Sequence, residues 1–394
     1  MKRYKYVFLR PMNRVYFDSA ATTQLREEVI NCMSEVLKNE YGNPSSTHSY
    51  GRSSKSLLET ARKEIASHLN VSAAEIIFTS GGTEADNLIL KSCVKDLRVK
   101  RIITSKIEHH AVLYTAQNLQ EKYGITVDYV TLGASGQVDH EHLEDLLRDT
   151  QQKTLVSLMH VNNEIGNLLD LKYVATLCKK YDALFHSDTV QSVGHFDLDF
   201  SEIPIDFAAV AAHKFHGPKG AGFAFIRKNS GLKPLILGGT QERGLRAGTE
   251  AVYAIVGMSE ALKRAYLNLD KERAYITSIK DYFKQEITSR IPGVTFNGNC
   301  SDNEKSTYTL LNICLPVSAE KATLLLFQLD LKGIACSKGS ACQSGSNAGS
   351  HVLTEILSAE DLAKPSIRFS FSSFNTKEEV DYVLDVLTKF IVPA

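Results

Sequence analysis

Two cysteines lie in a stretch of small residues near the end of the chain. Residues 335–350 read ACSKGSACQSGSNAGS, which places Cys336 and Cys342 among serines, glycines and alanines. A structural cysteine is usually buried as a small hydrophobe, whereas a reactive thiol has to be accessible and partly deprotonated. Because little in this stretch could pack, we expect a loop that carries an accessible thiol.

A lysine follows the most apolar strand expected in the chain. His213 and Lys214 come directly after FAAVAA, residues 207–212, and precede a GPKGAG turn. Poor solvation at a strand end lowers the pKa of an amine and makes it a usable nucleophile for a Schiff base. The alternative is a lysine whose stem covers the strand end while its ammonium group reaches water.

Two glycines, Gly81 and Gly82, follow another expected strand in FTSGGTEADN, residues 78–87, and we expect Thr83 to be the N-cap of the next helix. The free amides and the dipole of a helix N-terminus favour an anion, and glycines let a phosphate approach the backbone. The alternative is a tight turn before a capped helix, since the pattern is neither a Walker loop nor the dinucleotide fingerprint.

Three more side chains follow expected strands: Asp188 and Gln191 in HSDTVQSVGH, and His109 in SKIEHHAV. Asp188 could hold the proton of a pyridine-type nitrogen, Gln191 could bond a ring oxygen, and His109 could stack on a flat ring. Taken singly, Asp188 is better explained as a cap, Gln191 as a solvated turn residue and His109 as a satisfied histidine before a helix. Together with Lys214 and the glycine turn, they form the set that pyridoxal phosphate requires.

The elements that must position these residues alternate between short β-branched runs and helical patterns. Residues 75–230 contain seven strand candidates: EIIFTS, RIITS, TVDYVTL, TLVSLMHV, ALFHSD, FAAVAAH and GFAFI. Such alternation predicts a mostly parallel sheet covered by helices, with ligands beyond the carboxyl ends of the strands. The candidate site residues named above follow the expected strands, which is where this fold class places its ligands.

The rest of the chain predicts a second, smaller α+β unit. Residues 254–290 read as one long helical region with Ile276, Ile279, Phe283 and Ile287 on a stripe. An extended run (306–316), a helix (319–333), the thiol loop, a strand (366–372) and a last helix from Thr376 follow it. We expect a large domain at residues 20–265 and a small domain made of 1–19 and 266–394.

Composition argues against several classes of partner. Lys plus Arg and Asp plus Glu each total 45, so no net charge attracts nucleic acid or an acidic membrane. The first apolar run is interrupted by Arg10 and Pro11, too short for a signal peptide or a membrane span. Seven scattered cysteines make no disulfide framework, and without a CxxC pair we expect no metal site. A cytoplasmic protein fits.

Ten stretches in this order resemble the cysteine desulfurases of the NifS/IscS type. They are YFDSAATT, YGNPSSTHSYGR, FTSGGTEADN, SKIEHHAV, MHVNNEIG, SDTVQSVG, AHKFHGPKG, RGLRAGT, GSAC and SIRFS. These are pyridoxal-phosphate enzymes of the class V aminotransferase family, with the α/β fold type I of aspartate aminotransferase. The resemblance implies that fold: a large domain with a mostly parallel seven-stranded sheet and a small α+β domain.

The resemblance also implies a role for each matching position. Lys214 would form the Schiff base with the cofactor, Asp188 would lie beneath its pyridine nitrogen, and Gln191 would touch its ring hydroxyl. His109 would stack on the ring and move protons. The phosphate-binding positions match Gly82, Thr83, His213 and Thr249. Because the family places Thr249 in the neighbouring subunit's site, a homodimer is implied. Arg368 would hold the substrate carboxylate, with Asn163 close to cofactor and substrate, and Cys342 would be the catalytic thiol.

The implied reaction converts L-cysteine to L-alanine and leaves the sulfur on Cys342 as a persulfide. An acceptor protein, a scaffold or a thiolation enzyme, would then take it for iron-sulfur cluster assembly or thio-modification. Ala211 departs from the family, which usually has a phosphate-binding serine there, and we expect Cys336 to be structural. Two other readings stay open: another pyridoxal-phosphate reaction on the same fold, and a non-catalytic partner that scaffolds sulfur transfer.

Overall fold

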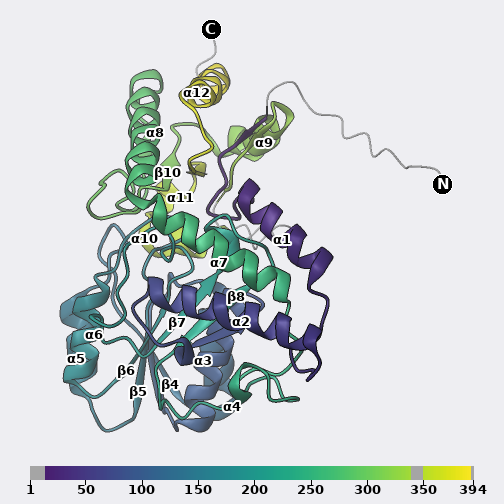
Figure 1. Ribbon diagram of the computed structural model, residues 1–394. Coiled ribbons are helices and arrows are strands. Elements are labelled where there is room, and N and C mark those ends of the chain that lie inside the picture. Colours follow the sequence, from purple (N-terminus) through teal and green to yellow (C-terminus); the bar gives the residue numbers. More distant parts are fainter. Residues whose placement is uncertain (1–13, 339–348, 392–394) are drawn as a thin grey trace.

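The computed structural model describes residues 14–338 and 349–391, which form a large α/β layer structure with a smaller unit beside it (Figure 1). Within these residues, the helices are too short or too polar for any of them to cross a bilayer.

A seven-stranded sheet is the centre of the large unit. Its strands are β2 (Ile76–Thr79), β3 (Arg101–Thr104), β4 (Thr126–Tyr129), β5 (Thr154–Ser157), β6 (Leu184–Asp188), β7 (Phe207–Ala211) and β8 (Gly222–Ile226). Their order is β2-β8-β7-β6-β5-β3-β4, and only β8 runs antiparallel to its neighbours. All seven predicted strands are confirmed, and so is the mostly parallel sheet.

Helices cover both faces of this sheet, because the strands are apolar on both sides. One face packs against α3 (Gly82–Asp96) and α4 (His110–Tyr123). The other packs against α1 (Glu27–Asn39), α2 (Ser49–His68), α5 (His140–Arg148), α6 (Leu171–Lys180) and α7 (Val252–Leu267). Short 3-10 helices are η1 (Ala73–Glu75), η2 (Ala212–Lys214) and η3 (Glu242–Gly244). In β2, Ile77 faces α3 while Ile76 and Phe78 face the opposite layer, as the two-residue period of a strand requires.

The smaller unit is built on a three-stranded antiparallel sheet of β9 (Thr295–Phe296), β10 (Leu310–Cys314) and β12 (Ser366–Ser370). A two-stranded parallel pair joins β1 (Val15–Tyr16) to β11 (Ile334–Ala335). The helices of this unit are α8 (Leu269–Arg290), α9 (Ala319–Leu331), α10 (His351–Ile356), α11 (Ala359–Leu362) and α12 (Lys377–Ile391). A capping box of Thr376 and Glu379 starts α12.

The first described strand packs with the last part of the chain. Phe17 is fully buried, and its ring lies 5.2–6.3 Å, centroid to centroid, from Phe283, Phe369 and Phe371. This aromatic cluster holds the segment after β1 in the core of the smaller unit. The exact division at residues 19/20 and 265/266 stays a prediction.

The single helical region expected over residues 254–290 is wrong in one respect. The chain forms two helices, and the break is at Asn268, whose φ of −108° and ψ of 9° are not helical. The Asn268 side chain donates to the carbonyl of Arg264, so it satisfies a backbone group at the end of α7. The stripe on α8 is confirmed, since Ile276, Ile279, Phe283 and Ile287 are buried.

Candidate active site

A cavity of about 210 Å³ opens at the carboxyl ends of the central strands. It is lined by nine of the eleven site residues predicted from the sequence: Gly82, Thr83, His109, Asn163, Asp188, Gln191, His213, Lys214 and Arg368. Thr249 is exposed and lies outside this lining, and Cys342 lies outside the described residues. The strand ends thus bring together side chains that are up to 286 positions apart between Gly82 and Arg368.

Lys214 reaches the cavity because β7 ends at Ala211 and η2 turns the chain. Its Nζ donates to the carbonyl oxygens of Ala20 and Ala21, at 2.5 and 2.8 Å. The Ala20 carbonyl also accepts from Gln191 Nε2 at 2.9 Å. The amine and the amide of Gln191 are therefore held beside each other by the same segment.

Asp188 is the last residue of β6 and is 7% exposed. Its Oδ1 accepts from the Val190 N–H at 2.9 Å. Burial raises the pKa of Asp188 to about 6, while the Val190 N–H and the nearby Lys214 act in the opposite direction. A protonated ring nitrogen beside this carboxyl would stabilise it as an anion, which is the partner that a pyridinium needs.

His109 is the N-cap of α4, and its Nδ1 accepts from the Ala111 N–H at 3.1 Å. Burial lowers its pKa to about 4, with Lys214 and His351 adding to the effect. The imidazole is therefore neutral at pH 7, with its proton on Nε2. A neutral ring can stack on a flat heterocycle and can exchange a proton through Nε2.

The N-cap of α3 is Gly81, so the expectation that Thr83 caps this helix is wrong. Gly81 has φ 153° and ψ −176°, a backbone conformation that is essentially restricted to glycine, and no side chain caps the helix. A Cβ on Gly82 would lie 2.5 Å from Cγ2 of Val190. The backbone amides at this helix end therefore face the cavity without a side chain across them, which suits a phosphate.

Arg368 is the middle residue of β12, which is an edge strand of the three-stranded sheet, and it is 1% exposed. Its Nη1 donates to the Asn163 carbonyl at 2.7 Å, and its Nη2 lies 2.8 Å from Oδ1 of Asp18. Its Nε is buried and has no hydrogen-bond partner among the described residues. Two of the five N–H groups thus fix the guanidinium in place, and the others remain as donors for a carboxylate.

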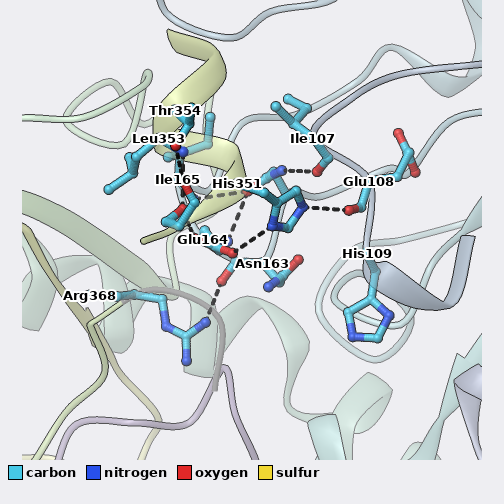
Figure 2. Close-up of polar contacts among 12 residues, drawn as sticks. Ile107, Glu108, His109, Asn163, Glu164, Ile165, His351, Leu353, Thr354 and Arg368 are labelled. Carbon is cyan, nitrogen blue, oxygen red and sulfur yellow. Dashed lines mark hydrogen bonds and ion pairs between the residues drawn. The ribbon is translucent and has the colours of Figure 1, made fainter. Parts of the chain in front are cut away.

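Figure 2 shows the Asn163 side chain between Arg368 and His109. Glu164 is fully buried and accepts from the hydroxyl of Ser350, the N-cap of α10, at 2.5 Å. The neighbouring His351 donates from Nε2 to the Glu108 carbonyl at 2.9 Å. The start of α10 is therefore held by the Glu164 side chain and the Glu108 carbonyl, which are next in sequence to the cavity residues Asn163 and His109.

The chain before residue 339 is fixed to the same region. Ser337 exchanges two backbone hydrogen bonds with Arg368, and its hydroxyl donates to Oδ1 of Asp18 at 2.7 Å. Cys336 is next to it, partly buried, and burial together with Asp18 raises the pKa of its thiol to about 12. A thiol that holds its proton so strongly is a poor nucleophile, which supports the structural role expected for Cys336.

One acidic residue of the cavity was not predicted as a site residue. Asp86 lies on α3, one turn after Gly82, and both its carboxyl oxygens are buried without a hydrogen bond among the described residues. The available signal was its helical spacing of four from Gly82, which puts the two residues on one face. Ala20, Ala21 and Met159 also line the cavity, but nothing in their types could have indicated it.

Comparison with known proteins finds class-V aminotransferases, cysteine desulfurases and NifS-like proteins similar to this chain. Residues 15–383 match the family model described as aminotransferase class-V. Cysteine desulfurase IscS of Dictyoglomus turgidum is 43% identical over 379 residues, which cover 96% of this chain and 94% of that protein. A solved NifS-like protein superposes with a TM-score of 0.87 at 35% identity, covering 96% of this chain and 99% of its own. SspA, solved in complex with cysteine, has a TM-score of 0.79 at 31% identity, with 92% and 100% covered. The fold class expected from the resemblance is confirmed.

Proposed function

Because this chain belongs to the aminotransferase class-V family and is one of its cysteine desulfurases, we propose that it binds pyridoxal phosphate at Lys214 and converts L-cysteine to L-alanine. The sulfur is held as a persulfide on Cys342 and passes to an acceptor protein, for iron-sulfur cluster assembly or thio-modification. The observation that carries the proposal is one cavity lined by Lys214, Asp188 and Arg368, which supplies an amine, a buried carboxyl and a guanidinium.

The donor set fits the cofactor. Lys214 offers the amine for a Schiff base, Asp188 a carboxyl for the ring nitrogen, and Gln191 an amide for the ring hydroxyl. The end of α3 at Gly82, together with Thr83 and His213, offers donors for the phosphate. Bound pyridoxal phosphate supplies an electron sink, which makes the side-chain sulfur of cysteine open to attack by a thiolate.

The residues on the opposite wall suit an amino-acid substrate. The Arg368 guanidinium is positioned by Asp18 and the Asn163 carbonyl, and it lines the cavity as a charged donor for a substrate carboxylate. Asn163 lines the cavity beside Arg368, and from this position it would contact both substrate and cofactor. His109, neutral and with a proton on Nε2, is placed to exchange a proton above the ring.

The sulfur step needs a nucleophile that no described residue provides. The thiol of Cys336 retains its proton, because burial raises its pKa to about 12. The resemblance of GSAC to the family's motif assigns Cys342 as the acceptor: its thiolate forms the S–S bond, the carbon–sulfur bond of the substrate breaks, and that electron pair stays on the carbon, which takes up a proton as alanine leaves.

The proposed protein is a homodimer in the cytoplasm. Thr249 lies on an exposed segment outside this cavity, where the site of a second subunit of a homodimer could use it for the cofactor phosphate. The six described cysteines are free thiols, which suits a reducing compartment such as the cytoplasm.

The test mixes the purified holoenzyme with L-cysteine without reductant, then measures alanine and locates the added sulfur by peptide mass spectrometry. One extra sulfur on Cys342, and none on Cys336, supports the proposal. Cys336→Ser is the matched control and should form alanine normally, whereas Cys342→Ser should not. Sulfur on Cys336, or full turnover by Cys342→Ser, would contradict the assignment, and a protein without a bound-cofactor absorption band would contradict the cofactor.

A further inference from the structure

Asp86 is a buried carboxyl that the proposed reaction does not use. It is 1% exposed, lies in the second turn of α3, and lines the cavity beside Asp188 and His109. One oxygen or nitrogen atom of each of these three side chains lies within 4.8 Å of those of the other two. A fully buried carboxyl at this distance from Asp188 must affect how Asp188 holds its charge.

The strand β6 supplies the neighbour of Asp86. His186 and Asp188 are two residues apart on β6, so both point to the face covered by α3. His186 is fully buried, and its Nε2 lies 3.3 Å from Oδ1 of Asp86. Its Nδ1 lies 2.8 Å from the hydroxyl of Ser157, and the Ser157 carbonyl accepts from Thr104. The Nδ1 side of the imidazole is thus held by Ser157, while its Nε2 side faces Asp86.

The charges around Asp86 decide its state. Burial raises the pKa of the Asp86 carboxyl, and Asp188 on β6 and Glu108 before α4 add to this effect when they are charged. His186 offers no compensating positive charge, because burial lowers its pKa to about 3. Burial likewise lowers the pKa of the nearby His109 to about 4. Ionisation of two buried carboxyl groups within 4.8 Å of each other is disfavoured, and Asp188 is the one with an N–H donor and Lys214 to stabilise its charge.

We infer that Asp86 is a positioning residue that stays protonated, so that Asp188 is the anion facing the cofactor's ring nitrogen, with His186 holding the acid group of Asp86 in place. This inference rests on the proposed function, because it assigns Asp188 to that nitrogen. Asp86 acts through Asp188: its uncharged polar group stabilises the neighbouring anion without competing with it for the ring proton.

Asp86→Asn is the decisive variant, since it keeps the shape and a donor but cannot ionise. In wild type, the infrared spectrum should contain the carbonyl band of a protonated carboxylic acid that Asp86→Asn lacks, with and without pyridoxal phosphate. With the cofactor bound, the pH midpoint of its visible absorption band should be the same in both proteins, within about 0.3 pH units.

Asp86→Ala removes the polar group and should raise that midpoint by about one pH unit, because a buried anion loses a polar neighbour. Without it, Asp188 competes better for the ring proton, and a less positive ring holds the proton on the Lys214 nitrogen more tightly. Asp206→Asn is the matched control, because Asp206 is a half-buried carboxyl that accepts from Phe185 N–H at the other end of β6. It should leave the midpoint unchanged.

Two results would overturn the inference. An infrared difference without an acid band, or a midpoint that moves as far in Asp86→Asn as in Asp86→Ala, would show that Asp86 is an anion. A midpoint that stays constant in Asp86→Ala would show that it has no effect on Asp188. The infrared measurement stands even if Asp86→Ala fails to fold. The infrared measurement also needs no cofactor, so its failure differs from a failure of the proposed function. The latter would appear as a missing visible absorption band of the cofactor in wild type.

Discussion

His195 Nε2 donates a hydrogen bond to the backbone carbonyl of Lys214, with 2.9 Å between nitrogen and oxygen. On its other side, the His195 carbonyl accepts from the Tyr308 hydroxyl at 3.1 Å, and Arg273 lies over the rings of Phe196 and Tyr308. Tyr308 and Arg273 belong to the smaller unit. His195 thus connects the backbone of the proposed Schiff-base lysine to the smaller unit.

We expect His195→Ala to lower the free energy of unfolding by about 1–3 kcal/mol, because it leaves the Lys214 carbonyl without its partner. His195→Gln should restore part of this loss, since its amide can donate from a similar position. Chemical denaturation of the two variants and the wild type provides the measurement. Equal stability of all three proteins would show that the hydrogen bond contributes nothing.

Arg368→Lys should raise the KM for L-cysteine by about 10- to 100-fold, because lysine cannot keep Asn163 and Asp18 as partners while it donates to the substrate. The kcat should fall less than the KM rises. The control is Arg290→Lys, a surface residue of α8 that pairs with Glu286, Asp381 and Asp385. Steady-state kinetics measure the KM for L-cysteine, and an unchanged KM in Arg368→Lys would show that Arg368 does not bind the substrate.

Glu108 makes stability depend on pH. Burial raises its pKa from 4.5 to about 8, against the opposing effect of its hydrogen bonds with Ser105 and Met159. Between these two values the folded protein binds more protons than the unfolded chain, so the free energy of unfolding falls as the pH rises. Glu108→Gln can keep both hydrogen bonds without a charge. Its stability should equal that of wild type near pH 5 and exceed it increasingly up to pH 8.

Thermal or urea unfolding across this range tests the expectation for Glu108. The difference between the two proteins isolates Glu108 from other titrating groups. Parallel curves for wild type and Glu108→Gln would mean that another group causes the slope.

Cys336 should react slowly with iodoacetamide in the native protein at pH 8. Its pKa of about 12 leaves almost no thiolate, and the buried Cys93, whose pKa is also raised by burial, should behave in the same way. Both should be alkylated promptly in urea, which serves as the control. Mass spectrometry of peptides gives the extent of labelling, and rapid native labelling of Cys336 would argue for a reactive role.

Ala211→Ser should tighten pyridoxal phosphate binding by about three- to tenfold, the effect of one neutral hydrogen bond. Ala211 lines the cavity at the end of β7, three residues before Lys214, where the resemblance to the family leads us to expect a phosphate-binding serine. Equilibrium dialysis of the cofactor measures the change. Weaker binding in Ala211→Ser would show that the hydroxyl finds no partner there.

The sequence allows the sheet and most of the cavity to be predicted, because both depend on local patterns. The strands are β-branched runs, and Lys214, Asp188 and His109 follow such runs directly. Asp86 could not be found in this way: its importance comes from His186 and Asp188, which reach it across the sheet from another element. The break at Asn268 was missed for a related reason, since a helical period continues on both sides of it.

The assignment of the α3 cap shows a different limit. Thr83 is a residue type that often caps helices, and its preference was read from the sequence alone. The structure starts the helix at Gly82 because Gly81 adopts a conformation that only glycine accepts, which moves the helix start toward the cavity. Backbone conformation at a glycine pair depends on the surrounding packing, here the side chain of Val190, and a pattern of residue types does not contain it.

The two anchors that flank the proposed sulfur-bearing segment have an evolutionary consequence. Ser337 is held by Arg368 and Ser350 by Glu164, so whatever lies between them starts and ends at fixed points on the wall of the cavity. Such a segment can be exchanged for another of different length or composition while the chemistry of the pocket is retained. Delivery to a new recipient could then diverge independently of catalysis, and chimeric enzymes with transplanted segments become a practical way to redirect sulfur.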